Sequence, residues 1–316
     1  MKILVRIVAG LVSAFAVLVT GFVIINWAPD RPVAELLPRW APPPSTFVEV
    51  AGMSVHLRDE GPRDDEIPIV LLHGTAASLH TWQGWADALK TWRRIIRFDL
   101  PGFGLTGPAP DGDYTMDNYV RFVGAMLDKL GVKRCVLGGN SFGGFLAWRT
   151  ALAHPERVDK LILVDAGGYA LAATAPPLGF RIAQLPVFNR IFEKTLPRGL
   201  VESSVRAVYG DPDRVTPALV DLYYDIALRA GNRQALAQRF AQARPGEFAD
   251  RIPRLTQPTL ILWGGRDTLV PLEAAERFHR DIAGSKLVIF TDLGHVPHEE
   301  DPTRTVAAVK DFLGLE

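Results

Sequence analysis

One serine of this chain stands at a sharp turn between a predicted strand and a predicted helix. Ser141 is the centre of Gly139-Asn140-Ser141-Phe142-Gly143, which follows the apolar run Cys135–Gly138 and precedes the helix-like stretch Phe145–His154. Such a turn strains the serine backbone, and side chains two residues to either side would collide, which explains both flanking glycines. A glycine-rich turn without function shows the same five letters, but its context favours a serine hydroxyl presented for nucleophilic attack.

An aspartate and a histidine follow later strand-like segments. Asp267 comes after the apolar run 259–264, and His295 comes after the strand-like run 286–290. Open α/β sheets place functional groups at the carboxyl ends of their strands. A serine hydroxyl is a weak nucleophile, and an imidazole, with an ordinary pKa of about 6.5, accepts its proton and then passes it to the leaving group. We therefore predict Ser141 as nucleophile, His295 as base and Asp267 as the carboxylate that orients the imidazole.

Each of these assignments has a rival in the sequence. His298 lies three residues from His295, and His73 ends an apolar run of its own. Asp165 stands at the end of the strand-like segment 161–164, which is another place for the acid. The pair Gly294-His295 and the run Gly265-Arg266-Asp267 favour the first choices.

The chain from about Thr46 to Leu315 resembles the α/β-hydrolase superfamily. Four stretches carry this resemblance: Leu72-His73-Gly74-Thr75, Phe98-Asp99-Leu100-Pro101-Gly102-Phe103-Gly104, Gly139-Asn140-Ser141-Phe142-Gly143-Gly144, and Gly294-His295 with Gly265-Arg266-Asp267 upstream. The nucleophile, acid and histidine also follow one another in the order that this fold uses.

The resemblance implies further roles at the site. Two main-chain N–H groups, those of Thr75 and Phe142, would form the oxyanion hole, with Ala76 as the alternative to Thr75. His73 would support the loop that carries Thr75, and the segment 99–104 would be a shaped loop beside the site. We expect no cofactor. The only metal-like run, 295–300, contains a proline that argues against a helical ligand arrangement, so we expect no metal either.

The predicted fold is an α/β-hydrolase fold with a mostly parallel central sheet. Strand-like and helix-like segments alternate through the first part of the core, residues 46–168, and return in the second part, 256–316. Between them, residues 169–255 show helical periodicity near 178–185, 187–196, 200–209, 217–230 and 233–243, which predicts a helical cap. Several aromatic residues of this cap are candidates to line a substrate pocket: Phe180, Phe188, Phe192, Tyr223, Tyr224 and Phe240.

The amino-terminal segment has the sequence features of a membrane anchor. Residues 7–29 carry no charge, and 7–27 are almost wholly apolar, which matches the roughly 20 residues that a spanning helix needs. Lys2 and Arg6 precede this run and favour a cytoplasmic amino terminus. We therefore expect a transmembrane anchor at 1–28, a proline-rich extended stalk at 29–45 and a catalytic domain on the periplasmic side. A cleavable signal peptide is the alternative.

Composition limits the partners. The formal net charge is +0, so nothing favours nucleic acid, and we expect none as a partner. The single cysteine, Cys135, lies in a predicted buried strand, where it fills core volume. The expected partners are a small apolar ester-type substrate and a lipid bilayer, and the sequence does not indicate an oligomeric state.

These features favour a membrane-anchored serine hydrolase, carboxylesterase-like, that cleaves an ester with an apolar part through an acyl-enzyme. A serine nucleophile argues against the haloalkane dehalogenases and epoxide hydrolases of the superfamily, which use aspartate. Carbon–carbon bond hydrolases of ring-cleavage products, cofactor-free haloperoxidases and proline iminopeptidases remain as alternatives. In a carbon–carbon bond hydrolase we expect a tryptophan near the catalytic histidine, and the sequence around His295 contains none. A non-catalytic ligand-binding protein is the alternative from another class.

Overall fold

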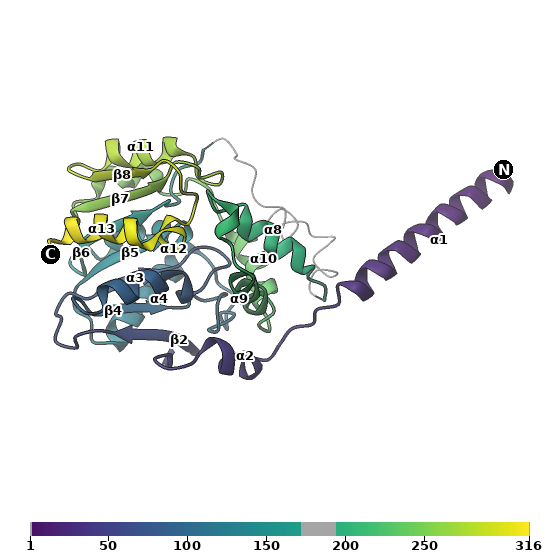
Figure 1. Ribbon diagram of the computed structural model, residues 1–316, viewed down its shortest axis with the longest axis horizontal. Coiled ribbons are helices and arrows are strands. Elements are labelled where there is room, and N and C mark those ends of the chain that lie inside the picture. The colour runs from purple at the N-terminus through teal and green to yellow at the C-terminus, as the bar shows by residue number, and fades with distance from the viewer. Residues whose placement is uncertain (1, 172–193, 316) are drawn as a thin grey trace.

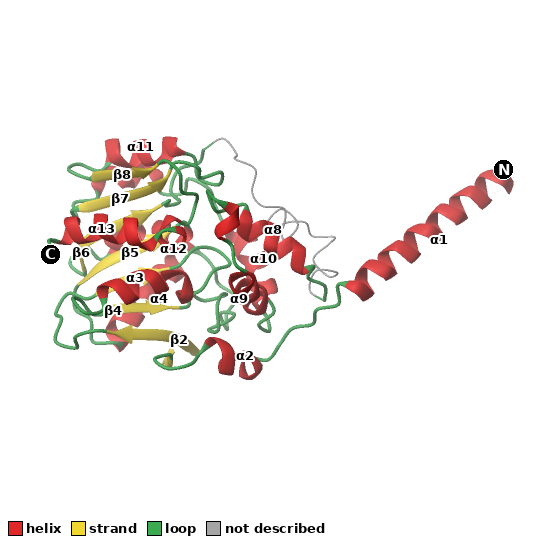
Figure 2. Ribbon diagram, in the orientation of Figure 1, coloured by secondary structure: helices red, strands yellow, loops and turns green. Residues whose placement is uncertain are grey.

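The computed structural model describes residues 2–171 and 194–315, and its centre is an eight-stranded sheet (Figures 1 and 2). The order across the sheet is β1-β2-β4-β3-β5-β6-β7-β8, and the strands from β4 to β8 run parallel, while β1 and β2 are antiparallel to their neighbours. The mostly parallel sheet predicted from the sequence is therefore confirmed. The strands are β1 (Thr46–Val50), β2 (Met53–Glu60), β3 (Ile69–Leu72), β4 (Ile95–Phe98), β5 (Cys135–Asn140), β6 (Val158–Val164), β7 (Thr259–Gly264) and β8 (Lys286–Phe290).

Helices cover both faces of this sheet, as a parallel sheet with continuous apolar strands requires. On one face, alternate strand residues such as Leu72 and Leu137 pack with α4 (Met116–Lys129), α5 (Phe142–Ala153) and α11 (Leu272–Asp281). On the other, residues such as Leu71 and Val136 pack with α3 (Gln83–Leu89) and α13 (Pro302–Leu313). Two short helices complete the core, the 3₁₀ helix η1 (Leu79–Trp82) and α12 (Pro297–Glu300).

A helical segment connects β6 to β7. In its described part it holds α8 (Arg198–Arg206), α9 (Pro217–Ala227) and α10 (Asn232–Gln242), with the 3₁₀ helices η2 (Pro212–Arg214) and η3 (Ala249–Arg254). The first three gather beside one end of the sheet (Figure 1). They occupy three of the five stretches where the sequence predicts helices. The predicted helix at 178–185 and most of that at 187–196 lie outside the described residues.

The amino-terminal helix α1 (Lys2–Ile25) extends away from the body of the molecule (Figure 1). Across residues 2–171 and 194–315, no helix has both the length and the apolar character that crossing a membrane requires. The spanning anchor expected at 1–28 is therefore not supported by the structure.

The segment after α1 is not the extended stalk that its prolines suggest. Residues Val33–Trp40 form helix α2, with Pro38 inside it and Leu36 only 1% exposed. The helix is fixed to α9, where Asp225 accepts hydrogen bonds from the Arg31 guanidinium at 2.9 Å and from the Trp40 indole at 2.9 Å. The prediction of an extended chain is wrong here because contacts with a distant helix stabilise an eight-residue helix that, with Pro38 inside it, is too short to be stable on its own.

Candidate active site

Ser141 lies at the strained turn between β5 and α5. Its backbone angles are φ 54° and ψ −115°, a conformation that a residue with a β-carbon adopts only at a cost. The helix begins at Phe142, directly after the serine. The turn is closed so tightly that a β-carbon on Gly143 would lie 2.2 Å from the carbonyl oxygen of Leu72, and one on Gly139 would lie 2.2 Å from that of Gly143. Glycine is therefore required at both positions for steric reasons.

Asp267 and His295 are directly bonded. The imidazole Nδ1 lies 2.7 Å from Oδ2 of Asp267, and both side chains are buried. The other carboxylate oxygen, Oδ1, accepts the main-chain N–H groups of Leu269 at 2.7 Å and Val270 at 3.1 Å. An ionised Asp267 accepts the Nδ1 proton, which leaves the lone pair of Nε2 available as a base.

Asn140, which precedes Ser141 in the chain, connects the serine turn to the histidine loop. The Asn140 amide donates to the main-chain oxygen of His295 at 2.9 Å and to that of Val164 at 3.2 Å. Within the described residues no direct hydrogen bond links the Ser141 hydroxyl to the imidazole. Such bonds are often long before a substrate binds. The catalytic roles of Ser141, Asp267 and His295 remain predictions, and of the contacts that they require the Asp267–His295 hydrogen bond is present.

The two rival histidines have other partners. His73 uses both ring nitrogens, Nδ1 toward the carbonyl oxygen of Gly74 at 2.8 Å and Nε2 as acceptor from Leu100 N–H at 3.0 Å. Nε2 of His298 pairs with the Thr81 hydroxyl at 2.9 Å. Burial lowers the pKa of both imidazoles, so both are neutral near pH 7. Neither is as suited as His295 to serve as the base.

The loop that carries Thr75 packs against the nucleophile. A β-carbon on Gly74 would lie 3.2 Å from the β-carbon of Ser141 and 2.9 Å from Oδ1 of Asn140. Phe142 is the first residue of α5, so its N–H lies at the positive end of the helix and has no acceptor one turn earlier. This geometry is compatible with the oxyanion hole proposed at Thr75 and Phe142. Ala76 has a φ of 59°, which turns the loop directly after Thr75.

Comparison with known proteins identifies the family. Residues 67–302 match the family model for the alpha/beta hydrolase fold. The chain belongs to this family. It is a hydrolase, and the resemblance seen in the sequence is confirmed.

Several relatives of this hydrolase are described by their reaction. A 2-hydroxy-6-oxo-2,4-heptadienoate hydrolase of Pseudomonas putida is 30% identical over 85% of this chain and 96% of its own. The solved structure of a meta-cleavage product hydrolase from Pseudomonas fluorescens IP01 has 27% identity and a TM-score of 0.71, and covers 85% of this chain and 97% of its own. A structure described as a membrane phospholipase A has 25% identity and a TM-score of 0.74, and covers 99% of this chain and 98% of its own.

One residue of the hydrolase that the sequence did not single out holds the histidine loop in place. The Glu300 carboxylate accepts three main-chain N–H groups, those of Gly294 at 2.8 Å, Gly210 at 3.0 Å and Asp211 at 2.8 Å. In addition, the N–H of His295 donates to the carbonyl oxygen of Val208 at 2.8 Å. The segment 208–211, which follows α8, is thereby fixed to the loop before His295. Glu300 belongs to the run considered for metal binding, and two of its three partners, Gly210 and Asp211, are about 90 residues away in the chain, too far to be inferred from the sequence.

We expect Glu300→Ala to loosen this connection. The substitution leaves three main-chain N–H groups without their acceptor, one buried and two part-buried, which costs about 3 kcal/mol in the free energy of unfolding. Urea unfolding measures this loss. Glu300→Gln keeps one acceptor oxygen, so its free energy of unfolding should lie between those of Glu300→Ala and the parent. An alanine variant as stable as the parent would show that water replaces the carboxylate at no cost.

The site also contains a close cluster of potential metal-binding side chains. One ligand atom each of Asp165, Asp267 and His295 lies within 4.8 Å of the other two. The 2.7 Å separation between the atoms of Asp267 and His295 is that of a hydrogen bond, and it is shorter than expected for two atoms that share one zinc ion at about 2.0–2.2 Å in tetrahedral geometry. We therefore interpret the cluster as a hydrogen-bonded unit.

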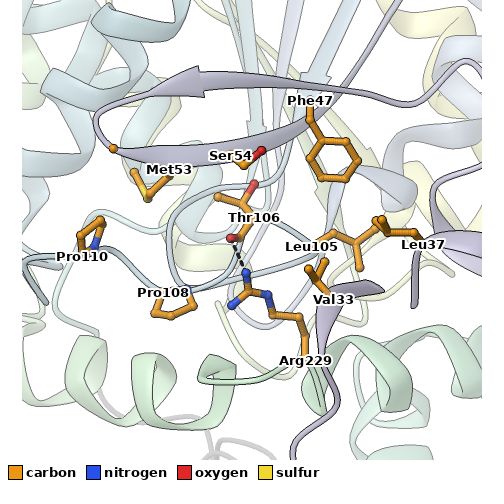
Figure 3. Close-up of a pocket in the computed structure, with 11 residues that line it drawn as sticks. Val33, Leu37, Phe47, Met53, Ser54, Leu105, Thr106, Pro108, Pro110 and Arg229 are labelled. Atoms are coloured by element: carbon orange, nitrogen blue, oxygen red, sulfur yellow. Dashed lines mark hydrogen bonds between the residues drawn. The ribbon is translucent and has the colours of Figure 1, made fainter. Parts of the chain in front are cut away.

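A separate cavity lies outside the proposed catalytic residues, between α2, the β1–β2 hairpin and the loop 105–110 (Figure 3). It has a volume of about 360 Å³. Its lining residues are Val33, Leu37, Phe47, Gly52, Met53, Ser54, Leu105, Thr106, Pro108, Pro110 and Arg229. The Arg229 guanidinium donates to the carbonyl oxygen of Thr106 at 2.9 Å.

The apolar pocket expected between cap and core has different candidate residues. Phe180, Phe188 and Phe192 lie outside the described residues. Tyr223 contacts the core, where its hydroxyl donates to the Glu299 carboxylate at 3.2 Å. The pocket therefore remains a prediction.

Proposed function

We propose that this protein is a serine hydrolase that uses Ser141, His295 and Asp267. The Ser141 hydroxyl attacks a carbonyl carbon of the substrate while His295 Nε2 takes its proton. The N–H groups of Phe142 and Thr75 stabilise the resulting oxyanion. The leaving group departs with the proton from His295, and water, activated by the same imidazole, releases the acyl group from Ser141. The observation that carries this proposal is the bonded Asp267–His295 pair, which Asn140 links to the serine turn.

The bond cleaved is, in this proposal, a carbon–carbon bond next to a carbonyl in a ring-cleavage product. The relatives described as 2-hydroxy-6-oxo-2,4-heptadienoate and meta-cleavage product hydrolases support this function. From the sequence alone it was only an alternative to ester hydrolysis, and the comparisons support it better than the ester. The absence of a tryptophan around His295, where we expect one in the carbon–carbon enzymes, is the observation against it.

Ester hydrolysis is the second candidate. The neighbour described as a membrane phospholipase A covers 99% of this chain, which includes the amino-terminal helix that lies outside the matched family region. The same nucleophile and base would cleave a carboxylic ester, with an alcohol in place of carbon as the leaving group.

A substrate panel tests both candidates with the full-length chain. One arm is a 2-hydroxy-6-oxodienoate, followed by loss of its dienolate absorbance, and the other is a series of p-nitrophenyl esters of increasing acyl length. We expect kcat/KM for the dienoate to exceed that for the best ester. The reverse order by about tenfold or more would favour the ester function, and activity in neither arm would oppose both.

We also propose that residues 1–28 attach the protein to a lipid surface, with the catalytic domain on the periplasmic side. Large apolar side chains of α1 are exposed, among them Leu11, Leu18 and Ile25. Lys2 and Arg6 precede them. Deletion of residues 1–28 should move the protein from the membrane fraction to the soluble fraction after cell lysis. An equal distribution of both forms would contradict the proposal.

A further inference from the structure

Asp165 is a buried acid next to Asp267 and His295, and the reaction described above assigns it no role. It follows β6, its side chain is 0% exposed, and its φ of 44° lies in the left-handed region. A non-glycine residue held in this region at a cost is a common feature of functional sites. This backbone conformation sets the direction of the Cα–Cβ bond of Asp165 at the end of the strand.

The hydrogen bonds of this carboxyl group are incomplete. Oδ1 accepts the N–H of Gly264 at 2.9 Å. Oδ2 is buried and has no hydrogen-bond donor among the described residues. The groups that face it are Asp267 and His295, with Glu300 as the next charge, so the neighbouring oxygens of Asp267 are themselves acceptors. Two buried acceptors that face each other need a proton between them, because a buried unpaired carboxylate is costly.

The donors decide which carboxyl group holds that proton. Asp267 receives three donors, namely the N–H groups of Leu269 and Val270 and the imidazole of His295. Asp165 receives one, from Gly264. Hydrogen bonds to the charged form stabilise the charged form. Burial, and then the charge of Asp267, raise the pKa of Asp165 well above its ordinary value, in agreement with this count of donors.

We propose that Asp165 is a positioning residue that carries a proton at neutral pH and donates it in a hydrogen bond to Asp267. The pair then bears one negative charge, and Asp267 is held toward His295 by a fourth donor. This inference rests on the proposed function for its catalytic consequence. The protonation state itself does not depend on which substrate the enzyme cleaves, or on whether it is an enzyme at all.

Stability as a function of pH tests the protonation state without any activity assay. Asp165 has a raised pKa in the folded state, so its contribution to stability is fully present below the unfolded pKa of about 3.9 and is lost as the pH rises toward the folded value. Asparagine at this position does not titrate. Relative to Asp165→Asn, the unfolding equilibrium constant of the parent should therefore rise about tenfold per pH unit between about pH 5 and 7.

Urea unfolding of the full-length parent and Asp165→Asn at several pH values measures this ratio. Asp213→Asn is the matched control, because the Asp213 side chain is 99% exposed, and its ratio to the parent should stay flat. A flat ratio for Asp165→Asn as well would mean that Asp165 is ionised in the folded protein, and this would overturn the proposal.

A second readout tests the positioning role. The asparagine amide can still donate to Asp267, whereas a leucine of similar size cannot. We expect Asp165→Asn to exceed Asp165→Leu in kcat by about tenfold or more, with the acid limb of its pH–rate profile at the position of the parent. Removal of a negative charge beside the imidazole would move that limb to lower pH. Such a shift, or equal rates for the two variants, would contradict the role, even where the substrate panel confirms the enzyme.

Discussion

Ser141→Ala should lower kcat by about 10⁶ while the protein stays folded. The substitution removes only the hydroxyl group. Loss of the nucleophile in a serine–histidine–aspartate unit typically lowers kcat by about this factor because the three residues act together. Alanine keeps the β-carbon, so the backbone at φ 54° is no more strained than in the parent. Steady-state rates with the most active substrate of the panel, and urea unfolding of the same samples, measure the two effects.

The control for Ser141→Ala is Ser203→Ala. Ser203 lies on α8, is exposed and donates to the carbonyl oxygen of Leu200 at 3.0 Å, so its loss should leave kcat within about twofold of the parent. A rate for Ser141→Ala within tenfold of the parent would exclude Ser141 as the nucleophile. A large loss of stability in the same variant would make the serine structural.

The turn at Ser141 was predictable because steric exclusion leaves a local mark in the sequence. A β-carbon at Gly139 or Gly143 meets main-chain oxygen atoms at 2.2 Å, so no other residue fits, and the glycines report the turn. The strands were predictable for a similar reason. Runs such as Ile69–Leu72 are buried on both faces of the sheet, which continuous apolar sequence indicates.

Features that depend on distant partners left no such mark. Helix α2 is stabilised through Asp225, about 190 residues away in the chain, and its eight residues with Pro38 among them are too few to form a stable helix alone. The carboxylate of Glu300 accepts hydrogen bonds from the N–H groups of Gly210 and Asp211, which the segment after α8 brings next to it. Local sequence contains neither relation, so only the assembled fold reveals them.

Asp165 was identified from the sequence, but its role was not. The sequence placed it at the end of a strand, as a rival to Asp267, and in the fold the two carboxyl groups are neighbours. The two acids are then not alternatives. In our proposal Asp267, which receives more hydrogen-bond donors, is ionised, and Asp165 is protonated. Sequence reasoning identified both residues, but the number of N–H groups that reach each oxygen follows from the geometry of the loop after β7.

Asp267→Asn should lower kcat by about 10⁴. Oδ1 of residue 267 accepts from the N–H groups of Leu269 and Val270, so the amide oxygen of asparagine takes that place and its NH₂ group faces His295. Nδ1 of the imidazole must then accept, and its proton moves to Nε2. A protonated Nε2 cannot take the proton of Ser141, while the size and position of the side chain stay almost the same.

The same variant distinguishes the two acids at this site. If Asp165 served as the orienting carboxylate, Asp267→Asn would keep most of its activity and Asp165→Asn would lose about 10⁴ instead. We expect the opposite order, because His295 Nδ1 is bonded to Asp267 at 2.7 Å and Oδ1 of Asp165 is held by Gly264. Single-turnover rates with the best substrate, together with KM, separate loss of the base from loss of binding. A loss below tenfold for Asp267→Asn would refute its role in fixing the tautomer of His295.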